Sequence, residues 1–258
     1  MIAEIHNKIS KTYSNLSERL EDNLTGNFFG TLRYFNNNNV LIEILKKIKT
    51  NDSALETNLN NVITTNDKLG YFFWKKNAAY GEIDLLIIGK KFYMGIEIKY
   101  HSGLSSDDEL KNISDSDFGE SNNQLAKYTR MINDSKKNKY GILIFIAPSS
   151  IGVRIYNDVI CRKIISPEVA FGYISWEDIY KVILTLDENN FEVNENIMIG
   201  DLVKYLEIKG FGSFNGFLLN QSKALSQKHY CFIETINLFN DIKCLIREDG
   251  YYGYKCTR

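Results

Sequence analysis

Residues 81–100, GEIDLLIIGKKFYMGIEIKY, carry the clearest structural pattern in the sequence. Two apolar runs flank the turn residues Gly-Lys-Lys, which is the pattern of a β-hairpin. Three charged residues, Asp84, Glu97 and Lys99, interrupt these apolar runs. Because burying an unpaired charge is costly, we expect each of them to meet a partner of opposite charge.

Alternation along the second strand places Glu97 and Lys99 on one face, roughly 7 Å apart. The opposite face is apolar and is predicted to pack into the core: Phe92, Met94, Ile96 and Ile98. Asp84 lies on the first strand and reaches the Glu97 face if the register of the hairpin allows it. The hairpin then presents two carboxylates and an ammonium group at one place.

This grouping suits hydrolysis of a phosphodiester. Mg²⁺ prefers oxygen ligands and keeps several waters, so one or two carboxylates and the phosphate oxygens of a substrate suffice to bind it. A bound metal ion lowers the pKa of a water and stabilises charge at phosphorus. A lysine beside it can position that water or bind the phosphate as a point charge. The alternative is a structural cluster of ion pairs on a half-exposed sheet face.

The sequence around the hairpin predicts further helices and strands. In residues 15–34 apolar side chains recur at intervals of four, which indicates an amphipathic helix: Leu16, Leu20, Leu24 and Phe28. A second helix begins at Val40 after a run of asparagines. Residues 123–137 predict a helix, and the apolar run 140–148 predicts a strand that is covered on both faces.

The order of these elements, with a strand and a helix in residues 171–187 directly after the apolar strand, predicts an α/β fold with a mixed central sheet flanked by helices. We expect a domain over residues 1–187 and a C-terminal extension over residues 188–258 that packs on the core, either as part of the same domain or as a small appendage. The long polar and acidic segment 101–123 is predicted to be a loop that is either functional or disordered.

Bulk composition restricts the surroundings and the partners. The net charge of −1 gives no support to a long basic surface, so any phosphate-binding patch is expected to be local. The four cysteines are far apart and form no CxxC pair, which is typical of free thiols in a reducing compartment. The polar N-terminus and the lack of a long apolar run predict a cytoplasmic protein without a membrane partner.

The charged residues of the hairpin resemble a known signature. Asp84, then twelve residues, then Glu97-Ile98-Lys99 is similar to the D…(D/E)xK signature of the PD-(D/E)xK nuclease superfamily. The proline that names this motif is absent, since Ile83 precedes Asp84.

Two further elements of the same resemblance occur in the order expected for the family. Gln124 and Tyr128, in the sequence QLAKY, resemble the QxxxY element of its RecB-like branch. Glu21, in LEDNLTGNFFGTLRY, resembles the acidic residue of an N-terminal helix that completes the metal site in many members. The resemblance covers residues 15–185.

The resemblance implies a restriction-endonuclease-like core and a metal site. Asp84 and Glu97 would hold Mg²⁺ or Mn²⁺, with the carbonyl of Ile98 as a further ligand. Glu21 would add a carboxylate directly or through water. Lys99 would orient the attacking water or neutralise charge on the phosphate.

Gln124 and Tyr128 would position Lys99 or contact the backbone of a nucleic acid. The implied activity is that of a magnesium-dependent endo- or exodeoxyribonuclease, in a prokaryotic defence or repair setting. DNA is the expected partner, and a homodimer is left open, because many such nucleases dimerise to cut both strands. The alternative is a catalytically inactive member that serves as a nucleic-acid or protein interaction module.

Overall fold

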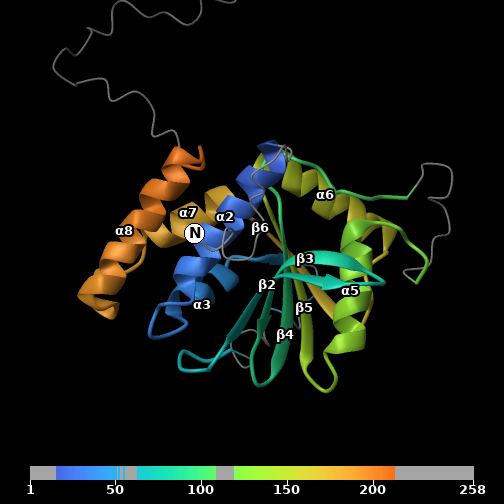
Figure 1. The fold of residues 1–258 in the computed structure, drawn as a ribbon, viewed down its shortest axis with the longest axis horizontal. Helices are drawn as coiled ribbons and strands as arrows, with labels where there is room; N and C mark the ends of the chain where they lie inside the picture. The colour runs from blue at the N-terminus through green and yellow to red at the C-terminus, as the bar shows by residue number, and fades with distance from the viewer. Residues whose placement is uncertain (1–15, 51, 53–54, 56–62, 109–118, 213–258) are drawn as a thin grey trace, which may run out of the picture. The chain divides into compact units, whose positions relative to one another are not determined.

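The computed structural model describes residues 16–50, 52, 55, 63–108 and 119–212, all within the unit formed by residues 1–213. The strands are β1 (Lys49–Thr50), β2 (Gly70–Asn77), β3 (Gly81–Ile88), β4 (Phe92–Ile98), β5 (Tyr140–Ala147) and β6 (Val169–Ser175). The α-helices are α2 (Leu16–Leu32), α3 (Asn39–Leu45), α5 (Gln124–Ser135), α6 (Ser149–Arg162), α7 (Trp176–Leu184) and α8 (Val193–Ile208). A short 3₁₀ helix, η2 (Glu188–Asn190), precedes α8 (Figure 1).

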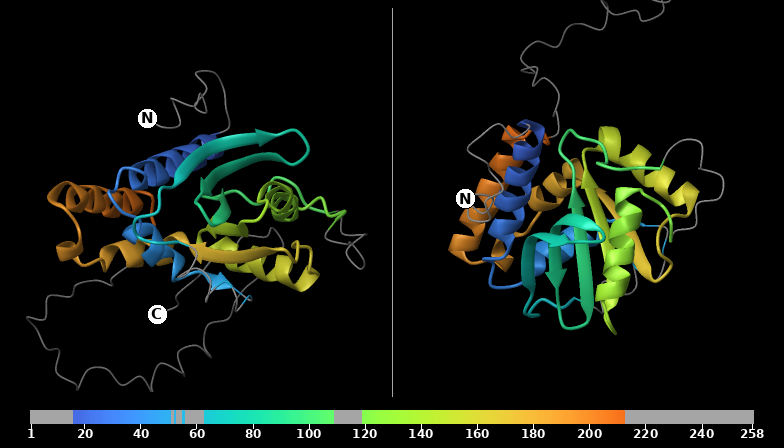
Figure 2. Two further views of the ribbon diagram at one scale, coloured as in Figure 1. Left: turned by 90° about the horizontal axis from the view of Figure 1, so that it is seen from below. Right: turned by 45° about the vertical axis from the view of Figure 1, so that its right-hand side comes forward.

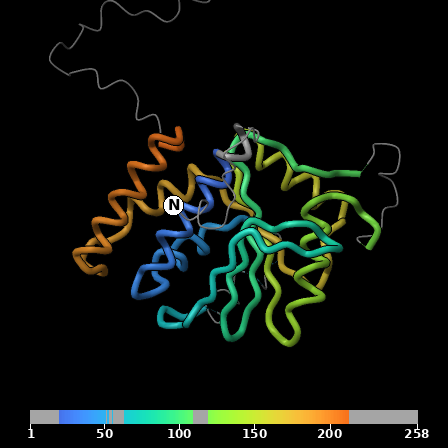
Figure 3. The backbone as a smooth tube through the Cα atoms, viewed as in Figure 1, coloured from blue at the N-terminus to red at the C-terminus, as the bar shows by residue number. Residues whose placement is uncertain are grey.

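The six strands form one mixed sheet in the order β1-β6-β5-β4-β3-β2. The hairpin β2-β3-β4 is antiparallel, β4, β5 and β6 are parallel, and β1 closes the far edge antiparallel to β6. The tube in Figure 3 follows this path from the hairpin through the parallel strands. The predicted α/β class, the mixed sheet and the flanking helices are therefore confirmed.

Helices cover both faces of the sheet, as the two views of Figure 2 show. One apolar cluster joins α2, α3, α7 and α8 to the sheet, and a second joins α5 and α6 to the opposite face. The apolar face of β4 lies in the first cluster, as predicted: Phe92, Met94, Ile96 and Ile98. Glu97 consequently points toward the side of the sheet that α5 covers.

Helix α6 is a correction to the sequence interpretation, which placed one strand directly after the other. Strands β5 and β6 are parallel, and a parallel pair needs a crossover connection that is usually helical. The helix lays Ile151, Ile155 and Val159 against the second cluster. These three residues recur at intervals of four, the period of a helix, so the sequence carries a signal for α6 that the sequence interpretation missed.

Strand β2 departs from regular alternation at Trp74, which has a φ of 47°. Trp74 lies between the register pairs Phe73↔Leu85 and Lys75↔Ile83, so it faces Asp84 across the ladder. A positive φ is an outlier for a bulky residue, and such strain is concentrated at functional sites. The kink is thus located opposite one of the predicted site residues.

The segment after α7 belongs to the same packed body. Leu202 and Leu206 of α8 are buried in the first apolar cluster. Residues 213–258, most of the predicted C-terminal extension, lie outside the described part of the chain, as do 109–118 of the acidic segment and residues 1–15. The boundary at residue 187 stays a prediction. Among the described residues no helix combines the length and the apolarity needed to cross a membrane.

The contact of α6 with β6 can be tested at Gly152. A Cβ atom at this position would lie 2.4 Å from Cε2 and 2.6 Å from the hydroxyl of Tyr173, a fully buried ring. We expect Gly152→Ala to lower the free energy of unfolding by about 1–3 kcal/mol, because the ring or the helix must move. The change is measured by urea denaturation.

The matched control is Gly200→Ala in α8, where a Cβ atom would meet nothing within 4 Å. This variant is expected to gain roughly 0.5–1 kcal/mol from the helix preference of alanine over glycine. An equal gain in both variants would show that α6 does not pack against Tyr173.

Candidate active site

Glu97 and Lys99 meet at the C-terminal end of β4, where both side chains are almost fully buried. The Lys99 Nζ lies 2.6 Å from Glu97 Oε1, and the two side chains are 7% and 1% exposed. The backbone of Lys99 is held on both sides: its N–H donates to the Ile146 carbonyl at 2.8 Å, and its carbonyl accepts from the Trp176 indole at 3.0 Å. The backbone that carries the ammonium group is therefore held in place, and Glu97 is a close ionic partner of that group.

Glu21 reaches the same ammonium group from α2. Its Oε1 lies 3.1 Å from Lys99 Nζ. Its Oε2 accepts from the Tyr100 N–H at 3.1 Å and from the Ser102 hydroxyl at 2.7 Å. The structure thus brings the predicted N-terminal carboxylate to the site, as a partner of Lys99 and of the backbone that follows β4.

Asp84 joins the site from β3. The last register pair of the hairpin is Leu85↔Ile96, so the next pair in that register sets Asp84 opposite Glu97. Asp84 Oδ2 accepts from the Ile98 N–H at 2.8 Å. The register therefore places Asp84 opposite Glu97, which is the condition that the sequence left open. Beyond the last register pair, the Asp84 carboxylate accepts the hydrogen bond of a backbone N–H of β4 in place of a strand carbonyl.

Gln124 and Tyr128 approach Glu97 from α5. Gln124 Nε2 donates to Glu97 Oε1 at 2.8 Å and lies 3.1 Å from the hydroxyl of Tyr128. That hydroxyl donates to the carbonyl of Glu82 on β3. Both residues of the QxxxY element therefore contact the site, and they contact Glu97 and β3 rather than Lys99.

Burial and like charge together disturb the titration of the carboxylates. Burial raises the pKa of Asp84 to about 6; the charge of Glu21 adds to this, while Lys99 and the Ile98 N–H oppose it. Burial, followed by the charge of Asp84, raises the pKa of Glu97 well above its ordinary value. Burial alone would lower the pKa of Lys99, but Glu97, Asp84 and Glu21 outweigh it and raise that pKa. Lys99 therefore stays an ammonium ion at neutral pH.

One atom of the site has no partner. Glu97 Oε2 is buried and accepts no hydrogen bond. A buried acceptor without a donor is costly, and a cation between Asp84 and Glu97 would satisfy it. Across the described ranges, no group of three or more His, Cys, Asp or Glu side chains is arranged to hold a metal ion. Two convergent carboxylates, Asp84 and Glu97, are what remains as a ligand set, and Mg²⁺ can be held by one or two carboxylates with waters completing its shell.

Two serines of the loop after β4 contact residues of the site and were not predicted from the sequence. Ser102 donates to Glu21, and the N–H of Ser105 donates to Gln124 Oε1 at 2.9 Å. Trp176, which fixes the carbonyl of Lys99, follows directly on the helix cap Ser175, whose hydroxyl accepts from the Asp178 N–H.

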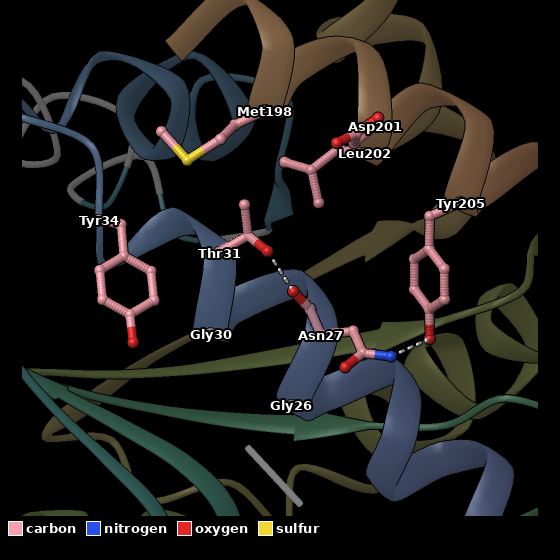
Figure 4. A pocket seen from close by; sticks show the side chains of 9 residues that line it. All are labelled: Gly26, Asn27, Gly30, Thr31, Tyr34, Met198, Asp201, Leu202 and Tyr205. Atoms are coloured by element: carbon pink, nitrogen blue, oxygen red, sulfur yellow. Dashed lines mark hydrogen bonds between the residues drawn. The ribbon is translucent and has the colours of Figure 1, made fainter. Parts of the chain in front are cut away.

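A groove of about 420 Å³ between α2 and α8 is a second concave feature (Figure 4). Its polar groups already bond to one another: Asn27 donates to the Tyr205 hydroxyl at 3.3 Å, and Thr31 donates to the Asn27 carbonyl at 2.7 Å. Asp201 is its acidic side chain, and no basic side chain lines it. The charged cluster at the end of β4, formed by Glu21, Asp84, Glu97 and Lys99, is the stronger candidate for a reactive site.

The role of Lys99 in holding the site together can be measured as stability. Lys99→Met leaves Glu97 and Glu21 without their cation in a buried place, so we expect a loss of about 3 kcal/mol in the free energy of unfolding. The control is Lys76→Met: Lys76 is 85% exposed and lies 3.8 Å from Glu82, so its loss should stay within about 0.5 kcal/mol. Equal losses in urea denaturation would contradict a buried ion pair at Lys99.

Comparison with protein-family models, with curated proteins and with solved structures found no match for this chain. Its function must therefore be inferred from its own residues.

Proposed function

We propose that this protein is a metal-dependent nuclease of the PD-(D/E)xK type, with DNA as its substrate and Mg²⁺ or Mn²⁺ as its cofactor. The observation that carries the proposal is the pair of carboxylates Asp84, which is half-buried, and Glu97, which is buried and has the free acceptor Oε2, beside the ammonium of Lys99. A restriction-endonuclease-like core is part of the proposal, supported by the antiparallel hairpin that continues into parallel strands.

Asp84 and Glu97 are the residues that would hold the ion, with the carbonyl of Ile98 beside them. When bound, the ion supplies a water of lowered pKa and positive charge next to phosphorus. Asp84 is already oriented by the Ile98 N–H, and Glu97 by Gln124 and Lys99. Little reorganisation of these ligands is then needed, which is the condition for effective electrostatic catalysis.

Lys99 acts in this proposal as a fixed positive charge. Its raised pKa makes it a poor proton acceptor at neutral pH, so it would orient a water or stabilise a phosphate oxygen rather than serve as a general base. Glu21 would hold the ammonium in place from the opposite side, at 3.1 Å. Tyr128 would support the site by tying Gln124 to β3.

One observation favours the second candidate, a catalytically inactive nuclease-like fold that binds nucleic acid or protein. The ammonium of Lys99 is already engaged by two carboxylates and is 7% exposed, so a phosphate would have to displace a partner to reach it. The net charge of −1 also offers few cations to neutralise phosphates.

The proposal predicts that metal binding and cleavage are lost together. Manganese and magnesium are titrated calorimetrically into the metal-free full-length protein and into Asp84→Asn and Glu97→Gln. Cleavage of plasmid and of single-stranded DNA is followed in parallel. We expect both variants to lose measurable metal binding and at least about 100-fold in cleavage, since each removes a direct ligand.

The matched control is Glu82→Gln, which neutralises a carboxylate two residues from Asp84 that pairs with exposed Lys76. It should bind metal and cleave DNA within about 2-fold of wild type, as expected for a surface ion pair. Wild-type protein that binds DNA without metal and cleaves nothing would favour the inactive module. Variants that cleave as well as wild type would show that the site lies elsewhere.

A further inference from the structure

Arg162 is a buried arginine outside the candidate site that binds the segment after β4. This segment supplies two contacts of the site, from Ser102 to Glu21 and from Ser105 to Gln124. Arg162 is the last residue of α6, and its side chain is 8% exposed. Its guanidinium binds Asp107 at 2.8 Å and Asp158 at 3.1 Å through Nη1, and Asp108 through Nη2. The Nε atom is buried and has no hydrogen-bond partner among the described residues. The ion pairs of the side chain are therefore made by its two terminal nitrogens with these carboxylates.

Asp107 and Asp108 connect Arg162 to the start of α5. Asp108 accepts from the Ser121 hydroxyl at 2.6 Å and from the Asn122 N–H. Asp107 accepts from the side-chain amide of Asn123 at 2.9 Å. Asn123 in turn caps α5, with its side-chain oxygen accepting from the Leu125 and Ala126 N–H groups. Arg162 thus fixes both the segment after β4 and the first turn of α5.

The next residue along the chain after this cap is Gln124. Its N–H donates to the carbonyl of Ser106 at 3.0 Å, and its Oε1 accepts from the Ser105 N–H at 2.9 Å. These two bonds leave the side-chain amide pointing at Glu97 Oε1, 2.8 Å away. The orientation of Gln124 therefore depends on residues that directly precede Asp107.

We infer that Arg162 is a positioning residue for the carboxylate site, acting through Asp107 and Asp108 on Gln124 and thereby on Glu97. Its meaning for catalysis rests on the proposed nuclease function; its effect on the orientation of Gln124 does not. A lysine cannot replace it, because two separate guanidinium nitrogens are needed to bind Asp107 and Asp108 together.

The first test reads the position of Gln124 without reference to activity. In the full-length protein, amide hydrogen exchange is followed by NMR at the side chain of Gln124 and at the N–H of Ser105. Arg162→Met is expected to speed both exchange rates on the order of 10-fold while the strands of the sheet keep their protection. Unchanged rates in Arg162→Met would overturn the inference. If that variant does not fold, Arg162→Lys is measured in its place, with the same two readings.

The matched control is Asp158→Asn. Asp158 is the third carboxylate on Arg162, is 53% exposed and sits one turn earlier on the same helix. Its loss leaves the bonds to Asp107 and Asp108 intact, so both exchange rates should stay at the wild-type value. Equal acceleration in the control would mean that any change at α6 loosens the segment, and it would overturn the specific role of Arg162.

The second test is a double-mutant cycle on cleavage with Gln124→Ala. Loss of such a supporting contact typically costs 10–100-fold in activity or metal affinity. Arg162→Met should lower kcat on the order of 10-fold in the wild-type background with the KM for DNA unchanged, and should add nothing in Gln124→Ala. Fully additive losses would overturn the inference.

The two proposals fail in distinguishable ways. If the wild-type protein neither binds metal nor cleaves, but the exchange at Gln124 responds to Arg162→Met alone, the nuclease proposal fails and the positioning role stands. If the wild-type protein cleaves, and Arg162→Met cleaves equally well with unchanged exchange at Gln124, the positioning role fails and the nuclease proposal stands.

Discussion

The buried ammonium of Lys99 ties helix α2 to the end of strand β4. It sits between Glu97 and Glu21, which lies on α2, 78 residues earlier in the chain. A buried ammonium ion is tolerated only when its carboxylate partners are present. A shift of the helix relative to the strand would leave a buried charge without its partner, so this ion pair restrains α2 on the sheet together with the apolar packing of the first cluster.

At the C-terminal end of β4, side chains form hydrogen bonds with backbone groups of the site. Where the β3-β4 ladder stops, the Asp84 carboxylate accepts from the Ile98 N–H and the Trp176 indole donates to the Lys99 carbonyl. Buried backbone groups must be paired, and here side chains of the site pair them. Fold and site are consequently built from one set of contacts. A substitution at the site therefore changes stability as well as chemistry.

The hairpin and the meeting of its charges could be predicted because they follow from the two-residue period of a strand. The spacing of four residues predicts that Gln124 and Tyr128 share a helix face, but their place in the site was predicted only from the resemblance of QLAKY to the QxxxY element. The contacts of Arg162 with Asp107 and Asp108 were not predictable, because these partners lie 55 and 54 residues away and no periodicity links them; only Asp158 is one helical turn away. Nor was the kink at Trp74, since a local preference gives no reason for a tryptophan to adopt a positive φ.

Two charged clusters among the described residues have the same composition but different unsatisfied atoms. Each sets three carboxylates against one cation: Glu21, Asp84 and Glu97 around Lys99, and Asp107, Asp108 and Asp158 around Arg162. At Arg162 two of the carboxylates are about half exposed, so water can solvate their excess charge, and the unsatisfied atom is a donor. Around Lys99 the side chains of Glu97 and Glu21 are only 1% and 13% exposed, and the unsatisfied atom, Glu97 Oε2, is an acceptor. A proton or a cation can satisfy an acceptor and neither can satisfy a donor, so the metal ion that we propose belongs to the Lys99 cluster and the positioning role that we infer belongs to Arg162.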